Sequence, residues 1–152
     1  MKAFYAGSFD PFTIGHLSIA RRALDMFGSL VIGIGYNEKK PSGSPIGKRI
    51  KQIEEVFSDL EGVIVLAYDN LTVDVAREAG CGVLVRGVRD ANDFCKEKEL
   101  ADINLEVFGM PTVFIPAEPG LSYVSSSMVR ELTHFGYDPK EFIAKKHTTK
   151  GN

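Results

Sequence analysis

Short apolar runs alternate along this chain with longer segments in which apolar residues recur every three or four positions. Such a recurrence places apolar side chains on one face of a helix, whereas a short unbroken run is typical of a strand buried on both faces. The runs predict strands at residues 2–6, 30–36, 63–68, 82–87 and 111–117. The periodic segments predict helices at residues 16–27, 48–57, 71–80, 92–108 and 125–135, with a weaker one after Pro139. This alternation predicts an α/β fold, an open parallel sheet with helices on both faces.

Four loops of unusual composition follow the predicted strands. The carboxyl ends of parallel strands lie along one edge of a sheet, where ligands bind near the first turns of the following helices. We therefore expect these loops to meet at one edge and to form a binding site. They span residues 7–16, 37–47, 86–92 and 117–127.

Composition and charge narrow the class of protein. A chain of 152 residues with 44% hydrophobic and 25% charged residues is typical of a single globular domain, here residues 1–152 with a polar tail from about residue 145. The formal net charge of −2 argues against broad nucleic-acid binding, which needs a basic surface. No apolar run is long enough to span a membrane.

The cysteines and histidines indicate a reducing compartment and no dedicated metal site. Cys81 and Cys95 form no CxxC pair, and no secretory signal peptide is recognisable, so we expect a cytoplasmic protein. His134 and His147 lie far from any acidic loop, and no group of His, Cys and Asp has the spacing of metal ligands.

The stretch GSFDPFTIGH, from Gly7 to His16, carries more polar groups than a turn between a strand and a helix requires. Gly7 permits a close backbone approach, and Ser8 places a hydroxyl directly after the strand. His16 falls in the first helical turn, where free N–H groups and the helix dipole favour anions, so its ring can donate a hydrogen bond to a phosphate. The alternative is structural: Asp10 and Thr13 cap the helix and His16 lies on the surface.

Cationic residues occur in two of the other loops. Arg86 and Arg89 end a predicted buried strand, and the planar guanidinium suits a phosphate because it forms two parallel charge-assisted bonds. Lys39 and Lys40 lie in the loop after the second strand. Each of these cations has a simpler alternative, namely a surface side chain in solvent.

The long helix predicted at 92–108 contains a carboxylate and an amide within an apolar stripe. Steps of three and four residues place the following residues on one face: Phe94, Glu97, Leu100, Asn104 and Val107. This pattern fits either a shallow edge of the core or a face that lines a ligand site.

Two helix starts carry hydroxyl groups. Thr72 or Asn70 is expected to cap the helix at 71–80. Ser125–Ser127 open the last long helix, where hydroxyls and free N–H groups together make an anion site suited to phosphates. One of these three serines is expected to be the cap.

Three of these stretches together resemble the signatures of one enzyme family. GSFDPFTIGH is similar to the first signature of the nucleotidyltransferase superfamily, and VSSSMVREL (residues 124–132) is similar to the second. With VRGVRD (residues 85–90) between them, the chain resembles the bacterial phosphopantetheine adenylyltransferases over essentially its whole length. The resemblance implies a Rossmann-like fold with five parallel strands. It also implies transfer of an adenylyl group from ATP to 4′-phosphopantetheine, which gives dephospho-coenzyme A and pyrophosphate.

The resemblance further implies roles for particular residues. The catalytic residues would be Ser8, His16 and Lys39, with Lys40 as an alternative to Lys39. The residues that bind ATP would be Ser8, Phe9, His16, Gly87, Arg89, Glu97, Ser125, Ser126 and Ser127. The residues that bind the acceptor would be Ser8, Lys39, Thr72, Arg86 and Asn104.

By the same resemblance, Mg²⁺ arrives with ATP and is held mainly by the phosphates, and the chain forms a homo-oligomer, a hexamer.

One departure from the family lies in the long helix. Cys95 and Lys96 stand where the family often has Glu and Tyr, which leaves the contacts of that turn with adenine or with a neighbouring subunit open.

Two other functions stay open. A sister nucleotidyltransferase would perform the same chemistry on nicotinate mononucleotide, FMN or glycerol phosphate, but is not expected to carry RGVRD followed by Glu97 and Asn104. A catalytically inactive nucleotide-binding regulator would bind ATP and release no pyrophosphate. The joint presence of four residues argues against a regulator: Ser8, His16, Arg86 and Arg89.

Overall fold

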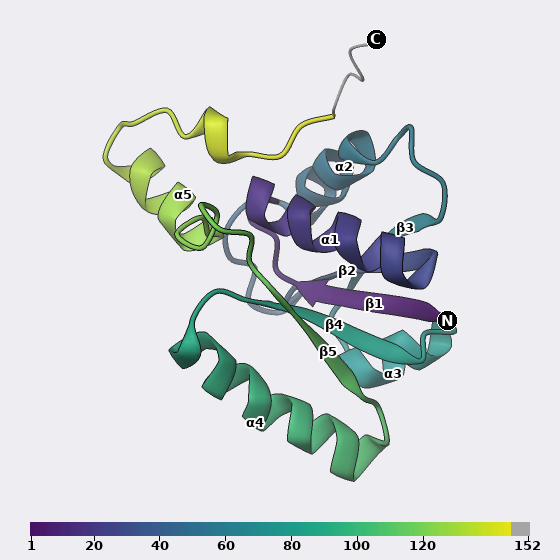
Figure 1. The fold of residues 1–152 in the computed structure, drawn as a ribbon. Helices are drawn as coiled ribbons and strands as arrows, with labels where there is room; N and C mark the ends of the chain where they lie inside the picture. Colours follow the sequence, from purple (N-terminus) through teal and green to yellow (C-terminus); the bar gives the residue numbers. More distant parts are fainter. Residues whose placement is uncertain (147–152) are drawn as a thin grey trace, which may run out of the picture.

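The computed structural model describes residues 1–146 and contains one sheet of five strands (Figure 1). The strands are β1 (Lys2–Gly7), β2 (Ser29–Gly35), β3 (Val63–Tyr68), β4 (Val83–Val88) and β5 (Thr112–Pro116). Their order in the sheet is β3-β2-β1-β4-β5, and every neighbouring pair is parallel. The predicted five-stranded parallel α/β fold is confirmed. Most of the expected polar tail, with His147, lies outside the described residues.

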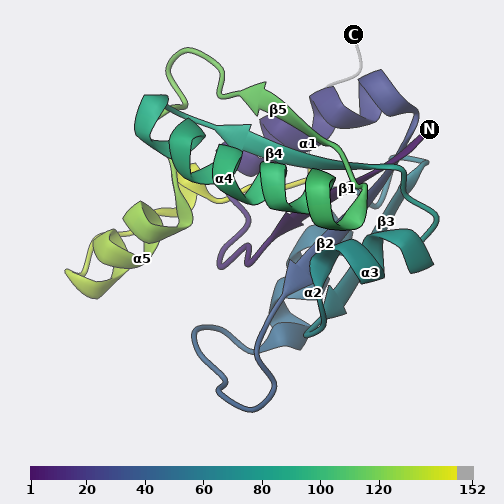
Figure 2. The same cartoon turned by 90° about the horizontal axis from the view of Figure 1, so that it is seen from below.

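Helices cover both faces of the sheet, as Figures 1 and 2 show. The helices on one face are α1 (Ile14–Phe27) and α2 (Ile46–Val56), and those on the other are α3 (Thr72–Glu78) and α4 (Ala91–Phe108). The helix α5 (Ser126–His134) and the 3₁₀ turn η1 (Lys140–Phe142) lie beyond the carboxyl edge of the sheet. Both layers are therefore present, and the carboxyl edge is left to the loops and to α5.

α1 begins at Ile14, two residues before the start that the apolar pattern predicts, and Thr13 is its N-cap. The Thr13 hydroxyl accepts a hydrogen bond from the backbone N–H of His16 at 3.2 Å, which satisfies one of the free donors of the first turn. Gly28 ends the helix in the left-handed conformation, with a φ of 74°. Thr13 therefore caps α1, as the structural alternative has it, whereas Asp10 does not cap this helix: its carboxylate accepts from the N–H of Ser44.

The start of α3 differs from the prediction. Leu71 occupies the N-cap position and makes no side-chain capping bond, so the expected cap at Thr72 or Asn70 is wrong. Thr72 is instead the first helical residue, and its hydroxyl shares a hydrogen bond of 2.9 Å with the phenol of Tyr68. The Thr72 hydroxyl thus bonds to Tyr68 at the end of β3 and does not cap the helix.

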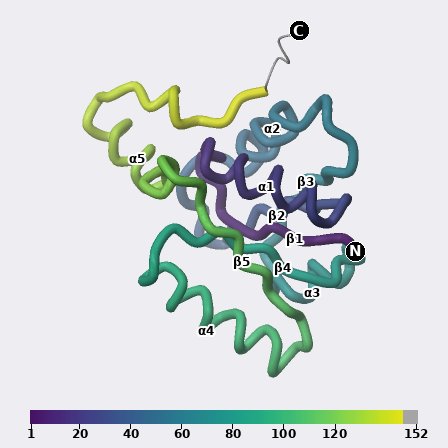
Figure 3. Tube along the Cα trace, in the orientation of Figure 1, coloured from purple at the N-terminus to yellow at the C-terminus, as the bar shows by residue number. Residues whose placement is uncertain are grey.

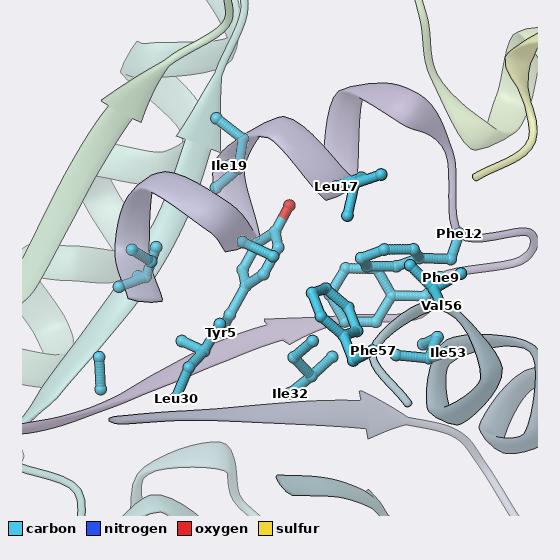
Figure 4. Packing of buried hydrophobic residues seen from close by; sticks show 14 of the residues in the cluster. Tyr5, Phe9, Phe12, Leu17, Ile19, Leu30, Ile32, Ile53, Val56 and Phe57 are labelled. Carbon is cyan, nitrogen blue, oxygen red and sulfur yellow. The ribbon is translucent and has the colours of Figure 1, made fainter. Parts of the chain in front are cut away.

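The larger core fills the space between the sheet and the helices α1 and α2 (Figure 4). β1 is the central strand, so its side chains are covered from both sides, and Tyr5 is buried on the α1 face. Phe12 and Phe57 pack edge to face, with ring centroids 5.9 Å apart, and Ile32 and Ile53 complete this part of the core. The loop after β1 is therefore anchored in the core by its own aromatic residues.

A second, smaller core lies on the opposite face. Phe4, Val31, Val73 and Leu84 are buried there between the sheet and α3. The ring of Phe4 occupies the space where a side chain at Gly33 would stand, so β2 needs a glycine at this position.

The strand order reverses beside β1. The chain passes outward through β2 to β3 and then returns to β4 on the other side of β1. The connections that leave β1 and β4 therefore diverge, and a crevice opens between the carboxyl ends of these two strands. The loops at residues 7–16 and 86–92 flank this crevice.

The C-terminal segment returns from α5 toward α2, as Figure 3 shows. The Ala144 N–H donates to the carbonyl of Phe12 at 3.0 Å, and Ile143 forms a bridge with Thr13. The Gln52 side chain on α2 donates to the Ala144 carbonyl at 3.4 Å. The segment thus holds the loop after β1 from outside. Of the described helices, none has the length and apolar character that crossing a membrane requires.

Candidate active site

The loop between β1 and α1 is built on buried aromatic side chains. Phe9 has a φ of 46°, which is rare for a residue other than glycine, and it is only 2% exposed. Its ring packs edge to face on Tyr5 and on Phe12, with centroids 5.0 and 5.3 Å apart. A Cβ on Gly7 would lie 2.8 Å from the Phe9 ring, so no larger residue fits there. This packing fixes the backbone that carries Ser8.

His16 is held in one tautomer by Thr13. The backbone N–H of Thr13 donates to Nδ1 of His16 at 3.0 Å. Because Nδ1 accepts this bond, the proton of the neutral imidazole lies on Nε2. The ring is wedged between Phe9 and Phe12, with centroids 5.0 and 5.5 Å away. His16 therefore presents an oriented N–H donor.

Burial, together with the smaller effect of the positive charges of Arg86 and Arg89, lowers the pKa of His16 to about 3. The imidazole is neutral at physiological pH for this reason. A neutral donor suits a site that two guanidinium groups already make positive.

Arg86 reaches the same place from β4 and is fixed by three hydrogen bonds. Its Nε and Nη2 donate to the two carboxylate oxygens of Glu97 on α4, each at 2.7 Å, and its Nη1 donates to the carbonyl of Ala6. Burial by itself would lower the pKa of Arg86, but the bonds to Glu97 raise it above its usual value. These three bonds leave two of the five guanidinium N–H groups for a ligand.

Arg89 is held more loosely than Arg86. Its backbone N–H donates to Oδ2 of Asp93 at 3.1 Å, and its Nε lies 3.9 Å from the same oxygen. The side chain is 42% exposed, and an ion pair so open to solvent contributes little free energy. The Arg89 side chain can therefore turn toward an arriving anion.

The serine turn before α5 meets the first loop. The Ser125 hydroxyl caps α5 by accepting from the N–H of Met128 at 3.1 Å, which confirms that one of the three serines is the cap. The Ser126 hydroxyl donates to the carbonyl of Pro11 at 2.8 Å. The turn is thereby tied to the loop that leads into α1 and His16, although more than 100 residues separate them in sequence.

A cavity of about 390 Å³ lies where these groups converge, and we call it the serine-turn cavity. Arg86 forms part of its wall. All nine residues predicted to bind ATP line it as well: Ser8, Phe9, His16, Gly87, Arg89, Glu97, Ser125, Ser126 and Ser127. Loops far apart in the sequence thus form one positively charged site at the edge of the sheet.

A second and narrower cavity of about 190 Å³, the α4 cavity, lies on the other side of the Arg86–Glu97 pair. Arg86 and Glu97 line both cavities, so their ion pair forms a shared wall. Asn104, which is 7% exposed, and Thr72 line the α4 cavity. The structure therefore brings these predicted acceptor-binding residues to one place.

A third cavity of about 840 Å³, the second-loop cavity, lies beside Ser8. It is bounded by residues 35–38 and 41–46 of the loop after β2, and by Thr72 at the start of α3. Ser8 lines this cavity and the serine-turn cavity, and therefore stands between them.

Comparisons with known proteins show the family to which this chain belongs. A family model described as cytidylyltransferase-like matches residues 4–132. A phosphopantetheine adenylyltransferase of Phocaeicola vulgatus is 46% identical over 142 residues, covering 93% of this chain and 94% of that protein. A phosphopantetheine adenylyltransferase of Bacteroides fragilis is 43% identical, covering 95% of this chain and 96% of that protein. One of Treponema pallidum is 40% identical, covering 95% of this chain and 92% of that protein. This chain belongs to the phosphopantetheine adenylyltransferase family.

Solved structures share the fold of this family member. A bifunctional NMN adenylyltransferase/ADP ribose pyrophosphatase from Francisella tularensis superposes with a TM-score of 0.70 at 17% identity, over 96% of this chain and 45% of the longer protein. A lipopolysaccharide core biosynthesis protein from Thermoplasma volcanium gives 0.53 at 17% identity, over 78% and 96% of the two chains. At these identities the likeness concerns the fold alone.

Lys39 stands apart from the other residues that the family resemblance singles out. It is exposed and lines none of the three cavities. The backbone N–H groups of Lys39 and Lys40 donate to the side-chain oxygen of Asn37, at 3.0 and 3.2 Å. The structure does not bring either ammonium group to His16, and a catalytic role for Lys39 stays a prediction.

The stripe predicted on the long helix divides in the structure. Glu97 and Asn104 face the cavities, and Phe94 packs edge to face on Phe114, with ring centroids 5.2 Å apart. Val107 is 66% exposed, so the prediction of one shared face is wrong there. A step of three residues turns a helix about 60° short of a full turn, which carries Val107 away from the sheet.

Arg130 is a cavity residue that the sequence analysis does not single out. Its Nη2 donates to the Ser127 hydroxyl at 3.2 Å, and its Nη1 donates to the carbonyl of Asp10 at 2.7 Å. It adds a third guanidinium to the wall of the serine-turn cavity. The sequence contains one indication of this role. Arg130 lies four residues after Ser126, which places both residues on one face of α5.

Proposed function

We propose that this chain transfers the adenylyl group of ATP to 4′-phosphopantetheine and gives dephospho-coenzyme A and pyrophosphate. The observation that carries the proposal is the serine-turn cavity, in which the His16 donor, arginines and a capped helix start converge. Its membership of the adenylyltransferase family adds support, since relatives 39–46% identical carry that name.

The chemistry needs no protein nucleophile. A phosphate oxygen of the acceptor attacks the α-phosphorus of ATP, the bond to the bridging oxygen breaks, and pyrophosphate leaves with the electron pair. The protein must position both phosphates and stabilise the negative charge of the five-coordinate phosphorus. Nε2–H of His16 donates to an oxygen of that phosphorus, while Arg89 and the start of α5 hold the leaving phosphates.

The shared walls of the cavities separate the two substrates. ATP occupies the serine-turn cavity, with its phosphates against Ser125–Ser127. The acceptor phosphate approaches from the other side, toward Ser8 and the two unused N–H groups of Arg86. Both of these residues border the serine-turn cavity and one neighbouring cavity, so an acceptor oxygen can reach the α-phosphorus there.

The lining of the α4 cavity suits the pantetheine arm of the proposed acceptor. Its volume of about 190 Å³ is small, and its walls combine Leu71, Leu84 and Leu100 with the Asn104 amide. Beyond the Arg86–Glu97 pair, apolar side chains beside one amide suit a flexible arm that contains amide groups.

We propose that Mg²⁺ accompanies ATP and neutralises part of the phosphate charge. Within residues 1–146, no group of three or more His, Cys, Asp or Glu side chains is arranged to hold a metal ion. Phosphate oxygens and water molecules would therefore supply its ligands, as is usual for Mg²⁺ bound with a nucleotide.

The test is pyrophosphate release from Mg²⁺-ATP with 4′-phosphopantetheine, nicotinate mononucleotide, FMN or glycerol 3-phosphate, each repeated with CTP. We expect release only with ATP and 4′-phosphopantetheine, and identification of dephospho-coenzyme A by mass spectrometry. Release with another acceptor would keep the adenylyl chemistry and contradict the acceptor. ATP binding without release for any acceptor would favour the inactive regulator.

We propose further that the chain acts in the cytoplasm as a homo-oligomer, a hexamer by resemblance to its family. α4 exposes an unusual number of large apolar side chains: Phe94, Leu100, Ile103, Leu105 and Val107. Such a patch is typical of a surface that another copy covers. The two cysteines within the described residues, Cys81 and Cys95, are both free thiols, which suits a reducing compartment.

A further inference from the structure

Arg49 on α2 is a buried cation that no carboxylate neutralises. The residue is 7% exposed, and among the described residues no Asp or Glu oxygen lies within 4.0 Å of its guanidinium. Three backbone carbonyls accept its hydrogen bonds instead. Its Nε bonds to Ser44 at 3.0 Å, its Nη1 to Ser8 at 3.1 Å, and its Nη2 to Ser42 at 3.4 Å.

These acceptors belong to two different loops. Ser8 follows β1 and borders the serine-turn cavity, whereas Ser42 and Ser44 belong to the loop between β2 and α2. Figure 2 shows this second loop projecting beyond the sheet. Arg49 thus joins the projecting loop to the loop that carries the reacting groups.

Asp10 makes the same connection in the opposite direction. Its carboxylate, on the first loop, accepts the N–H of Ser44 at 2.9 Å. The carboxylate also occupies the space of a side chain at residue 43, where Gly43 has a φ of 72°. Asp10, Gly43 and Arg49 therefore form a clip between the two loops.

The position of the clip gives it a consequence for the acceptor side of the site. The wall of the second-loop cavity is formed largely by the loop that the clip holds, and Ser8 stands between that cavity and the serine-turn cavity. Lys39 and Lys40 lie three and two residues before Ser42, in the same loop. Holding Ser42 and Ser44 therefore limits where either ammonium group can lie.

We propose that Arg49 is a positioning residue, which acts through the clip to hold the loop of residues 37–45 and the backbone of Ser8 for the acceptor phosphate. The kinetic part of this inference rests on the proposed function, whereas the structural part does not. Arg49 does not touch substrate in this assignment. Its three carbonyl acceptors diverge, and the planar fork of arginine reaches all of them where a lysine ammonium cannot.

The structural test is hydrogen–deuterium exchange, read by mass spectrometry, on the peptide that spans residues 37–45. In Arg49→Met we expect this peptide to exchange at least about tenfold faster, the factor that follows from losing one charge-assisted hydrogen bond. The control is Lys51→Met, which removes an exposed cation of the same helix and should leave the exchange unchanged. Arg49→Lys, which keeps the charge, should still exchange several-fold faster than the unchanged protein.

The kinetic test compares the same variants in the adenylyl-transfer assay. We expect Arg49→Met to raise KM for 4′-phosphopantetheine by about tenfold and KM for ATP by much less. Unchanged exchange in a folded Arg49→Met protein would overturn the clip. Faster exchange with unchanged kinetics would overturn its use in the reaction.

Two safeguards keep these outcomes distinct. If Arg49→Met does not fold, as judged by circular dichroism, hydrogen–deuterium exchange is measured on Arg49→Lys and Asp10→Asn. These variants alter the side chain less. If the unchanged protein transfers no adenylyl group, the proposed function fails. The exchange experiment then still decides whether Arg49 holds the loop.

Discussion

The structure joins two features of His16 that its sequence context presents as alternatives, a place in the helix start and a place at the candidate site. Its backbone N–H is capped by Thr13, and its Nδ1 accepts from Thr13 in return, so the side chain is part of the helix start. The same bond places the ring proton on Nε2 at the wall of the serine-turn cavity. The structural cap thus orients the N–H donor to which the proposed function gives a catalytic role.

His16→Ala should lower kcat by about 10²–10³-fold, the usual cost of removing one donor to a developing negative charge. The affinity for ATP should fall only modestly, because Arg89 and the serine turn still hold the phosphates. Steady-state kinetics with 4′-phosphopantetheine and calorimetric titration of ATP measure the two effects. Equal losses in kcat and in ATP affinity would show that His16 serves ground-state binding.

The low pKa of His16 also predicts how stability depends on pH. The pKa is about 3 in the folded chain, against an ordinary value of 6.5 for the imidazole in an unfolded chain. As the pH falls below about 6.5, the unfolded state gains a proton that the folded state takes up only near pH 3. The free energy of unfolding should therefore decrease over this window, by about 2 kcal/mol from this group at pH 5.

Urea unfolding of the unchanged protein and of His16→Gln at pH 7.5, 6 and 5 tests this linkage. The difference between the two proteins isolates the contribution of His16 from that of the carboxylates. His134→Gln, an exposed histidine on α5, is the matched control and should follow the unchanged protein. Parallel curves for the unchanged protein and His16→Gln would contradict a lowered pKa.

Contacts between helices and strands build the site. The sequence predicts the helices and strands themselves far better than it predicts these contacts. Each predicted strand overlaps an observed one, because unbroken apolar runs leave few other structures. The Arg86–Glu97 pair could be anticipated only as two residues at one edge of the sheet. Their bidentate bond depends on how α4 crosses β4, which no local pattern contains.

Glu97→Gln tests whether the ion pair of Arg86 and Glu97, which separates the two cavities, is needed to bind the acceptor. A glutamine amide can accept only one bond from Arg86, and its NH₂ group faces the other guanidinium nitrogen, so the fork should turn away from its observed direction. We expect KM for 4′-phosphopantetheine to rise by about tenfold or more, the worth of a charge-assisted hydrogen bond. Glu99→Gln, an exposed position on the same helix, is the control.

The same experiment separates two roles of Glu97. The family resemblance assigns Glu97 to ATP, while the structure places it against Arg86 and both cavities. A rise in KM for ATP alone would show that Glu97 contacts the nucleotide and does not act through Arg86. A rise for the acceptor would identify it as a positioning residue.

At the scale of the whole molecule, the sequence reveals which loops meet but not how they are joined. Alternation of strand and helix places four loops at one edge, and the structure brings three of them to the serine-turn cavity. The hydrogen bonds that join the loops were not predicted. They are Ser126 with Pro11, Arg130 with Asp10, and Arg49 with Ser8. They connect residues 41 to 120 positions apart, and each is a side chain bonded to a carbonyl. Since every residue offers a carbonyl, no motif announces such a partner.

The exposed face of α4 leads to the last prediction, which concerns assembly. Ile103 and Val107 lie four residues apart on one face of the helix, are 52% and 66% exposed, and line none of the cavities of the site. Exposing both to water in a lone chain is unfavourable, and a second copy would remove that cost. Light scattering coupled to gel filtration should give about six times the chain mass of 16.7 kDa.

Ile103→Glu should shift that mass toward smaller species, because a carboxylate buried between copies lacks a partner. Glu106→Lys, at an exposed polar position of the same helix, is the matched control and should keep the assembly. A monomer at micromolar concentration in the unchanged protein would contradict the proposed oligomer. An undiminished mass in Ile103→Glu would place the interface elsewhere and leave the apolar face of α4 for a different partner.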